Sequence, residues 1–234
     1  MSELLIEFNT FTILGRCART GALGVITATG EMAVGSRVPF VEDGVGAVAT
    51  QALTDPRLGK KGLNLLRAGK SATEVIEALT AVDPHIEARQ LGVIDTQGNA
   101  AARTGSGNSD WKGHIATNGC VSMGNRLTNE GVVDAMAACF RETEAEPLWE
   151  RLMLSIEAGR DAGGQHGGQR SAAMYVCDNL DYALVDLRAD DYDEPVNELR
   201  RLYDLYVPRI PYYRRRAADP TIGPFSAWKD SAGL

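Results

Sequence analysis

Residues 10–30 read TFTILGRCARTGALGVITATG, and this stretch decides how the chain begins to fold. Two runs rich in β-branched residues flank Arg19-Thr20-Gly21, an order that predicts two strands joined by a tight connection. Residues 44–51, GVGAVATQ, predict a further buried strand whose small side chains suit close packing. These two stretches are therefore expected to be β-structure.

Two helices are predicted next. Leucines at helical spacing indicate a helix over residues 58–68, with Gly69 as its stop. Ser71-Ala72-Thr73-Glu74 is a capping box, which predicts that a second helix begins at Ser71. This second helix is expected to end before Asp83-Pro84, because a residue before proline avoids the helical conformation.

The rest of the chain alternates between the same two kinds of block. Strands are predicted over 89–95, 100–104 and within 115–123, then helices over 128–143 and 147–158, strands over 171–177 and 182–187, and a helix over 195–206 before a proline-punctuated tail. Hairpin strands that alternate with helix pairs favour antiparallel sheets covered by helices over a parallel βαβ sheet. The predicted class is α+β, in one domain, because no linker interrupts the pattern.

Composition excludes several functions. A chain of 234 residues with 44% hydrophobic residues can bury a core, and its net charge of −7 argues against nucleic-acid binding. The basic cluster 214–216 is open to two interpretations, a phosphate-binding patch or a solvated tail that packs on a neighbouring subunit. With no signal peptide pattern and no apolar run of ~18 residues, the sequence predicts a cytoplasmic protein that does not associate with membranes.

Metal and cofactor signatures are missing from the sequence. The four cysteines have no paired spacing, the three histidines lie far apart, and the default interpretation is buried free thiols and no metal. The glycine-rich run 163–168 lacks the lysine of a phosphate-binding loop. It is expected to be either a lid beside a cleft or a disordered surface loop, and no cofactor is expected.

Several segments, taken in order, resemble a bacterial family catalogued as domain of unknown function 1028. The resemblance covers about residues 10–206. The segments that carry it are Thr10-Phe11-Thr12-Ile13, 20–25, 33–36, 38–40, 44–52, 62–66, 89–95, Gly98, 104–105, 113–114, 124–125, 169–173 and 185–191.

That family is regarded as similar to N-terminal-nucleophile hydrolases, which implies a four-layer α-β-β-α sandwich of two antiparallel sheets between helical layers. The implied organisation is a leader over 1–9, one domain over 10–207 and a C-terminal tail over 208–234. The resemblance also implies a catalytic Thr10, whose side chain attacks a carbonyl while its own α-amine acts as the base. An α-amine has a pKa of about 7.7–8.0 and accepts a proton near neutrality, whereas the amide nitrogen present while residues 1–9 remain attached does not.

Five further polar residues are predicted to bind substrate, and each has a competing structural role. Gln51 binds a substrate carbonyl or caps the sheet, and Asn125 supplies an oxyanion donor or forms a tight turn with Gly124. Arg170 holds a substrate carboxylate, or pairs with Asp186, Asp190 or Asp191, and Asp186 is itself included in the predicted site. Glu31 sets specificity or is a solvated loop carboxylate.

These residues support two hypotheses for function. The first is a hydrolase that acts on a small amide, an acylated amino acid or a short peptide. The second is a noncatalytic metabolite-binding or regulatory protein that keeps the same fold and pocket. In either case the apolar and aromatic C-terminal stretch has little to bury against locally, which predicts a homodimer formed through the tail; its members are Leu202, Tyr203, Tyr206, Val207, Ile210, Tyr212 and Tyr213.

Overall fold

The computed structural model describes residues 9–232, and the predicted leader 1–9 lies outside this range except for Asn9. The chain divides into two compact units, Met1–Leu199 and Arg200–Leu234. The described part of the first unit holds two antiparallel sheets, one ordered β10-β9-β2-β1-β8-β7 and the other β3-β4-β5-β6. The strands are β1 Thr10–Arg16, β2 Leu23–Thr29, β3 Pro39–Glu42, β4 Gly46–Ala52, β5 Arg89–Asp95, β6 Ala100–Thr104, β7 Gly113–Thr117, β8 Cys120–Asn125, β9 Ser171–Cys177 and β10 Ala183–Ala189.

The predicted hairpin of residues 10–30 is confirmed and forms the centre of the larger sheet. Thr10 pairs with Thr29 and Arg16 pairs with Leu23, so β1 and β2 are in register along their whole length. Gly21 has a φ of 81°, a conformation that glycine adopts without strain, in the connection between the two strands. On its other side β1 pairs with β8, so that Thr10 also lies opposite Asn125.

The predicted first helix pair covers the smaller sheet. Helix α1, Pro56–Arg67, begins after Asp55, whose side chain accepts a hydrogen bond from the Arg57 backbone amide. Helix α2, Ala72–Val82, begins after Ser71, and the capping box with Glu74 is formed in both directions. The apolar faces of the two helices pack on the outer face of β4 and β5 through a cluster of eight buried residues, Val48, Leu58, Leu66, Ala72, Val75, Leu79, Leu91 and Val93.

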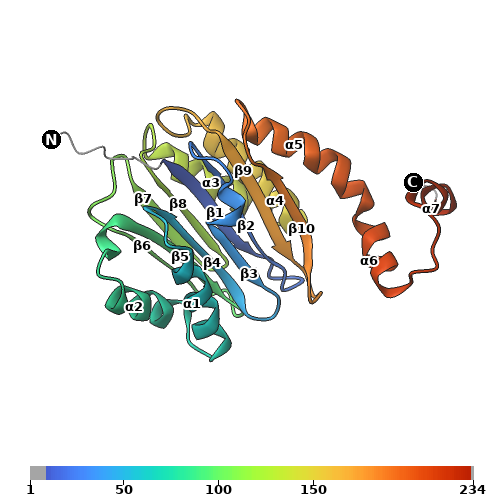
Figure 1. The fold of residues 1–234 in the computed structure, drawn as a ribbon, viewed down its shortest axis with the longest axis horizontal. Coiled ribbons are helices and arrows are strands. Elements are labelled where there is room, and N and C mark those ends of the chain that lie inside the picture. The colour runs from blue at the N-terminus through green and yellow to red at the C-terminus, as the bar shows by residue number, and fades with distance from the viewer. Residues whose placement is uncertain (1–8, 233–234) are drawn as a thin grey trace. The chain divides into compact units, whose positions relative to one another are not determined.

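The second predicted helix pair, α3 Gly131–Glu142 and α4 Leu148–Asp161, covers the larger sheet. A side chain at Gly15 would collide with Phe140 of α3, and one at Gly24 would collide with Leu152 of α4, so glycines on the strands let these helices approach closely. Figure 1 shows the two helix pairs on opposite sides of the two sheets. The predicted α-β-β-α sandwich of antiparallel sheets is thus confirmed.

The main core lies between the two sheets. Because side chains alternate along a strand, every second residue faces this space. On β1 and β2 these inward residues include Leu14 and Val25; Ala49, Ile94 and Met123 reach the same cluster from β4, β5 and β8. Apolar side chains therefore hold the two sheets together along most of their length.

Some of the predicted local structure is wrong. The short strand β3 was not expected, because its PFVE sequence offers too few residues to show a period. The run 163–168 is not a disordered loop: Gln165 is buried and forms a β-bridge with Leu127, and the Gly164 carbonyl accepts a hydrogen bond from the Thr128 amide. This loop is therefore packed against the segment that follows β8.

The C-terminal stretch is also more regular than its prolines indicate. Helix α5 spans Pro195–Tyr206, and the tail contains α6, Ile210–Ala218, and α7, Phe225–Ala232. Tyr212 is buried and packs against Phe225 and Trp228, with ring centroids 5.4 and 5.5 Å away. The expectation that these aromatic residues find nothing local to bury against is wrong, and the homodimer stays a prediction.

A membrane span can also be assessed. Within residues 9–232, none of the helices combines the length and the hydropathy that crossing a bilayer demands.

The capping box of α2 provides a test of this fold. We expect Ser71→Ala to lower the free energy of unfolding by about 1 kcal/mol, because the amide of Glu74 loses its acceptor. Thr73→Ala is the matched control, since Thr73 is an exposed residue of the same helical turn. Urea denaturation of both variants measures the difference, and equal stabilities would contradict the role of the cap.

Candidate functional site

A polar end of the inter-sheet space forms the candidate site. The strand positions that carry Leu14 and Val25 to the core also point Thr10, Thr12, Thr27 and Thr29 between the sheets. All four threonines are buried. The Thr12 and Thr27 hydroxyls are 2.6 Å apart and those of Thr10 and Thr29 are 3.0 Å apart. Hydroxyl groups therefore replace the apolar core at this end of the larger sheet.

The direction of the hydrogen bonds at Thr10 can be deduced. Thr29 Oγ1 donates its only hydrogen to the carbonyl oxygen of Asn9, at 2.6 Å. Between Thr10 and Thr29, the donor must then be the Thr10 hydroxyl. In this state the proton of Thr10 is directed at another hydroxyl, and neither that hydroxyl nor the Asn9 carbonyl is basic enough to remove it.

Asn9, directly before Thr10, is fixed at several atoms. Its carbonyl oxygen accepts from Thr29 Oγ1 and, at 3.2 Å, from the Gly30 amide, which also reaches Asn9 Oδ1 at 3.0 Å. Its side-chain amide donates to the carbonyl of His166. The carbonyl that precedes Thr10 thus carries two donors, the arrangement that stabilises negative charge on a carbonyl oxygen.

A cluster of three buried side-chain amides lies behind Thr10. Gln90 Nε2 donates to the carbonyls of Gly113 and Gly124 at 3.0 and 2.9 Å, and a carbonyl can only accept. This fixes the orientation of the Gln90 amide, so its Oε1 accepts from Gln51 Nε2 at 2.7 Å and from Asn125 Nδ2 at 3.1 Å. Gln51 Nε2 is also 3.4 Å from the carbonyl oxygen of Thr10.

This orientation leaves two acceptors without a donor. Gln51 Oε1 and Asn125 Oδ1 are buried, and neither has a hydrogen-bond partner in the described part of the chain. A buried unpaired carbonyl oxygen costs about 1–3 kcal/mol of stability. The described residues therefore leave two buried acceptors unused, on side chains that Gln90 holds in place.

The amide cluster continues to the surface through Thr104 and His114. Gln90 Nε2 is also 2.8 Å from Thr104 Oγ1, which shares one of the two amide hydrogens with a backbone carbonyl, so the hydrogen of Thr104 itself is available to His114 Nδ1, also 2.8 Å away. Burial lowers the pKa of His114, which favours the neutral ring that this bond requires. A continuous set of hydrogen bonds thus links the Thr10 carbonyl to a histidine that the sequence analysis did not connect with Thr10.

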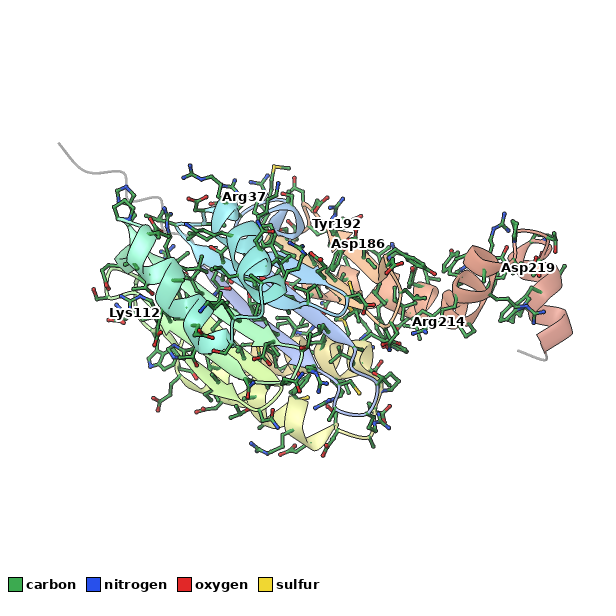
Figure 2. The ribbon with its side chains drawn as sticks, turned by 90° about the horizontal axis from the view of Figure 1, so that it is seen from below. Arg37, Lys112, Asp186, Tyr192, Arg214 and Asp219 are labelled. Carbon is green, nitrogen blue, oxygen red and sulfur yellow. The ribbon has the colours of Figure 1, made fainter. Side chains whose placement is uncertain are left out.

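Thr10 and Thr29 open into a small cavity of about 120 Å³, also lined by Glu31, Arg37 and Thr54. Arg37 and Thr54 line a neighbouring cavity of about 390 Å³ as well. The Arg37 side chain is exposed, and no hydrogen bond or ion pair to it occurs within residues 9–232. Figure 2 shows Arg37 at the surface of the first unit.

The structure brings four of the six predicted site residues together. Thr10 and Glu31 share the small cavity, and Gln51 and Asn125 surround Thr10 from β4 and β8. The unusual backbone conformation after Gly124 belongs to Arg126, with a φ of 51°, and not to Asn125, which lies within β8.

The other two predicted residues lie elsewhere. Arg170 forms an ion pair with Asp191 at 2.6 Å, which is one of the alternatives that the sequence left open. Asp186 is exposed on β10. Strand pairing places it directly across the sheet from Tyr175 of β9, Val25 of β2 and Leu14 of β1. At ~3.3 Å per residue and ~4.8 Å per strand, that position is about 20 Å from Thr10. Asp186 is thus outside the small cavity (Figure 2).

Sequence reasoning missed Thr29, Gln90 and Arg37. Strand alternation could have identified the first two. Thr29 and Gln90 each lie four residues from an inward-facing residue of their own strand, Val25 and Ile94, and so face the same side of the sheet. Arg37 follows the short 3-10 helix Val34–Ser36, and no periodicity marks it. No group of three or more metal-ligating His, Cys, Asp or Glu residues occurs within the described range.

Comparisons with known proteins identify a family and similar solved structures. The model of a family described as "Family of unknown function (DUF1028)" matches residues 10–199. The crystal structure of protein SPO2555 from Silicibacter pomeroyi, which carries the same family name, is similar with a TM-score of 0.80 and 32% identity, covering 94% of this chain and 93% of that one. Anbu (ancestral beta-subunit) from Yersinia bercovieri has a TM-score of 0.38 and 11% identity, over 86% of this chain and 96% of that one. Among curated proteins nothing matches.

The central position of Gln90 can be tested by stability. We expect Gln90→Leu to lower the free energy of unfolding by at least about 2 kcal/mol, because the amides of Gln51 and Asn125 lose their shared acceptor. Gln97→Leu is the control, since Gln97 is an exposed glutamine in a turn. Thermal unfolding compares the two, and a Gln90 variant as stable as the control would show that the amide cluster is not needed.

Proposed function

Because this chain belongs to the DUF1028 family and its fold buries a threonine hydroxyl beside a polarised carbonyl, we propose that it is an N-terminal-nucleophile hydrolase. Its substrates are acylated amino acids or short peptides, and the bond it cleaves is an amide. Thr10 is the nucleophile. The observation that carries the proposal is the Asn9 carbonyl, which adjoins Thr10 and holds two hydrogen-bond donors.

The same geometry supports self-cleavage before Thr10. Thr10 Oγ1 attacks the Asn9 carbonyl carbon, and the developing charge on its oxygen is stabilised by Thr29 Oγ1 and the Gly30 amide. The C–N bond to Thr10 breaks, the hydroxyl proton passes to the departing nitrogen, and an ester joins Asn9 to Thr10 Oγ1. Water then hydrolyses this ester, which releases residues 1–9 as an acid and leaves Thr10 with a free amine.

Cleavage also supplies the base that the uncleaved chain lacks. In the described state the Thr10 hydroxyl faces only Thr29, which cannot take its proton. A freed α-amine, with a pKa of about 7.7–8.0, is a competent base on the same residue. The unpartnered oxygens of Gln51 and Asn125 are then available as acceptors for that ammonium or for a substrate N–H group.

Arg37 supports the choice of substrate class. Arg37 lines the small cavity together with Thr10, and also the neighbouring cavity, without an ion-pair partner in the described range. A carboxylate forms charge-assisted, often bidentate, hydrogen bonds with a guanidinium group. An acylated amino acid or a short peptide offers a carboxylate near the bond to be cleaved, which a simple amide does not.

One observation favours the second hypothesis, a noncatalytic metabolite-binding protein. Asn9 is 5% exposed and its hydrogen bonds to Thr29, Gly30 and His166 hold it in the site. If this segment is permanent, Thr10 never gains a basic amine. The cavities beside Thr10 and Arg37 would then bind a carboxylate ligand without consuming it, and the ligand would stabilise the folded protein by mass action.

Self-cleavage predicts a defined N-terminus. We expect the intact mass and N-terminal sequence of the purified protein to show a chain that begins at Thr10. Thr10→Ala should remain uncleaved, because the attacking hydroxyl is gone, and Thr29→Val should be cleaved more slowly. Thr12→Ala is the matched control: Thr12 is a buried threonine on the same face of β1, and its loss leaves the Asn9 carbonyl unchanged.

Two outcomes separate the hypotheses. Cleavage before Thr10 in the wild-type protein and in Thr12→Ala, but not in Thr10→Ala, supports the hydrolase. An intact Asn9–Thr10 bond under all conditions, with a carboxylate ligand that raises the melting temperature unconsumed, would retire the hydrolase in favour of the binding protein.

The role of Arg37 gives a kinetic prediction. We expect Arg37→Gln to lower kcat/KM by about 10–100-fold for N-acyl amino acids, because loss of a charge-assisted hydrogen bond costs about 1.5–3 kcal/mol. The same variant should leave turnover of the matching N-acyl amino acid amides almost unchanged, since they carry no carboxylate. Release of free amine measures both rates. A selective loss in Arg170→Gln instead would assign the carboxylate to Arg170.

A further inference from the structure

A third and larger cavity lies at the far end of β1 from Thr10. Its volume is about 700 Å³, and it lies between the β7–β8 hairpin and the helices α3 and α4. Arg16, the last residue of β1, lines it, and at ~3.3 Å per residue that end is about 20 Å from Thr10. None of the residues around the small Thr10 cavity takes part.

Arg151 of α4 is the unusual group in this cavity. It is 6% exposed, and arginine is rarely buried unless its charge is paired. Its Nε and Nη2 donate to the carbonyl of Phe140 at 3.2 and 2.8 Å, and the guanidinium lies 3.7 Å from the centre of the Phe140 ring. No hydrogen bond to Nη1 occurs within residues 9–232, and no carboxylate lies within 4.0 Å of Arg151 there.

The charges near Arg151 do not neutralise it. Burial lowers the pKa of the guanidinium, and the thiols of Cys17 and Cys120 and the carboxylate of Glu144 act in the opposite sense, with Arg19 adding to the lowering. Burial raises the pKa of the Cys120 thiol to about 12, so Cys120 is not a thiolate at neutral pH. The pKa of the Cys17 thiol, which burial raises, is lowered on balance by hydrogen bonds with Thr20 and Arg19. Among the described residues, no carboxylate forms an ion pair with the Arg151 cation.

Two further arginines line the same cavity. Arg16 Nε is buried and has no hydrogen-bond partner, and Arg141 of α3 is exposed without an ion pair in the described range. The remaining walls are partly apolar, with Ile115 and Ala138 beside the Phe140 ring. Asp134 and Glu144 also line the cavity, yet neither forms an ion pair with these arginines within 4.0 Å.

From this arrangement we infer that the cavity bounded by Arg16, Arg141 and Arg151 is a binding site for a small carboxylate with an apolar body. The carboxylate contacts the guanidinium groups, with Arg151 as the buried anchor, and the apolar part lies against Ile115, Ala138 and the Phe140 ring. Asp134 and Glu144 accommodate an amino group where the ligand has one, so apolar amino acids belong to the same class. This site is independent of the proposed catalysis at Thr10.

Isothermal titration calorimetry of the full chain tests the site with four probes. L-leucine and 4-methylpentanoate carry a carboxylate and an apolar body, L-leucinamide lacks the carboxylate, and inorganic phosphate lacks the apolar body. We expect the two carboxylates to bind at least about tenfold more tightly than L-leucinamide, since a charge-assisted pair is worth that much or more. They should also bind more tightly than phosphate, which has no apolar part to bury against the apolar wall of the cavity. L-leucinamide or phosphate binding as tightly as the carboxylates, or no carboxylate binding at all, would overturn the proposal.

Variants then locate the site. Arg141→Gln and Arg16→Gln should each weaken carboxylate binding by about tenfold or more, because each removes one cation. Arg151→Gln is expected to abolish binding, but it changes a buried side chain, so the two others carry the test if that variant does not fold. Arg37→Gln should bind these carboxylates at the Arg151 cavity as tightly as the wild-type protein does, because Arg37 does not line that cavity. Loss of binding in Arg37→Gln with retention in Arg141→Gln would place the ligand in the small cavity beside Thr10 and overturn the proposal.

Discussion

The face-to-face packing of two antiparallel sheets is the constraint on which the rest of this structure depends. Each strand contributes every second side chain to the space between the sheets, so a change of residue type along the strands changes the character of that space. Leu14, Val25 and Ile94 make most of it apolar. At one end the same rows continue as threonines and amides, and that continuation forms the Thr10 site.

A buried polar cluster of this kind needs an internal set of hydrogen bonds, because water cannot supply them. Gln90 meets this need by donating to two backbone carbonyls while it accepts from the amides of Gln51 and Asn125. The cost appears at the two amide oxygens that remain unpaired. Unpaired hydrogen-bond acceptors beside a reactive hydroxyl are typical of a site whose hydrogen bonds are completed by a donor from a ligand.

The sequence predicted the layers better than the site. The hairpin at 10–30, the capping box at Ser71 and the alternation of strand and helix pairs are local signals, and the structure confirms them. The family resemblance supplied Thr10. Gln90 was not predicted because its importance comes from contacts with residues far along the chain, such as the hydrogen bond from Asn125. Arg37 was not predicted because only the folded chain places it in the same cavity as Thr10. Pairing of Arg170 with Asp191 was one of three possibilities, and only the sheet register selects it.

The two ends of β1 also differ in the way they meet a ligand. At Thr10 the buried groups are neutral hydroxyls and amides, which can exchange hydrogen bonds with a reacting carbonyl without a large desolvation cost. At the other end Arg151 keeps a charge out of water, where the Phe140 carbonyl and ring contact it and an opposite charge would stabilise it further. Neutral groups suit a bond that is made and broken during a reaction, whereas a buried cation suits a ligand that stays bound. A single strand with threonine at its start and arginine at its end thus separates two kinds of chemistry by its own length.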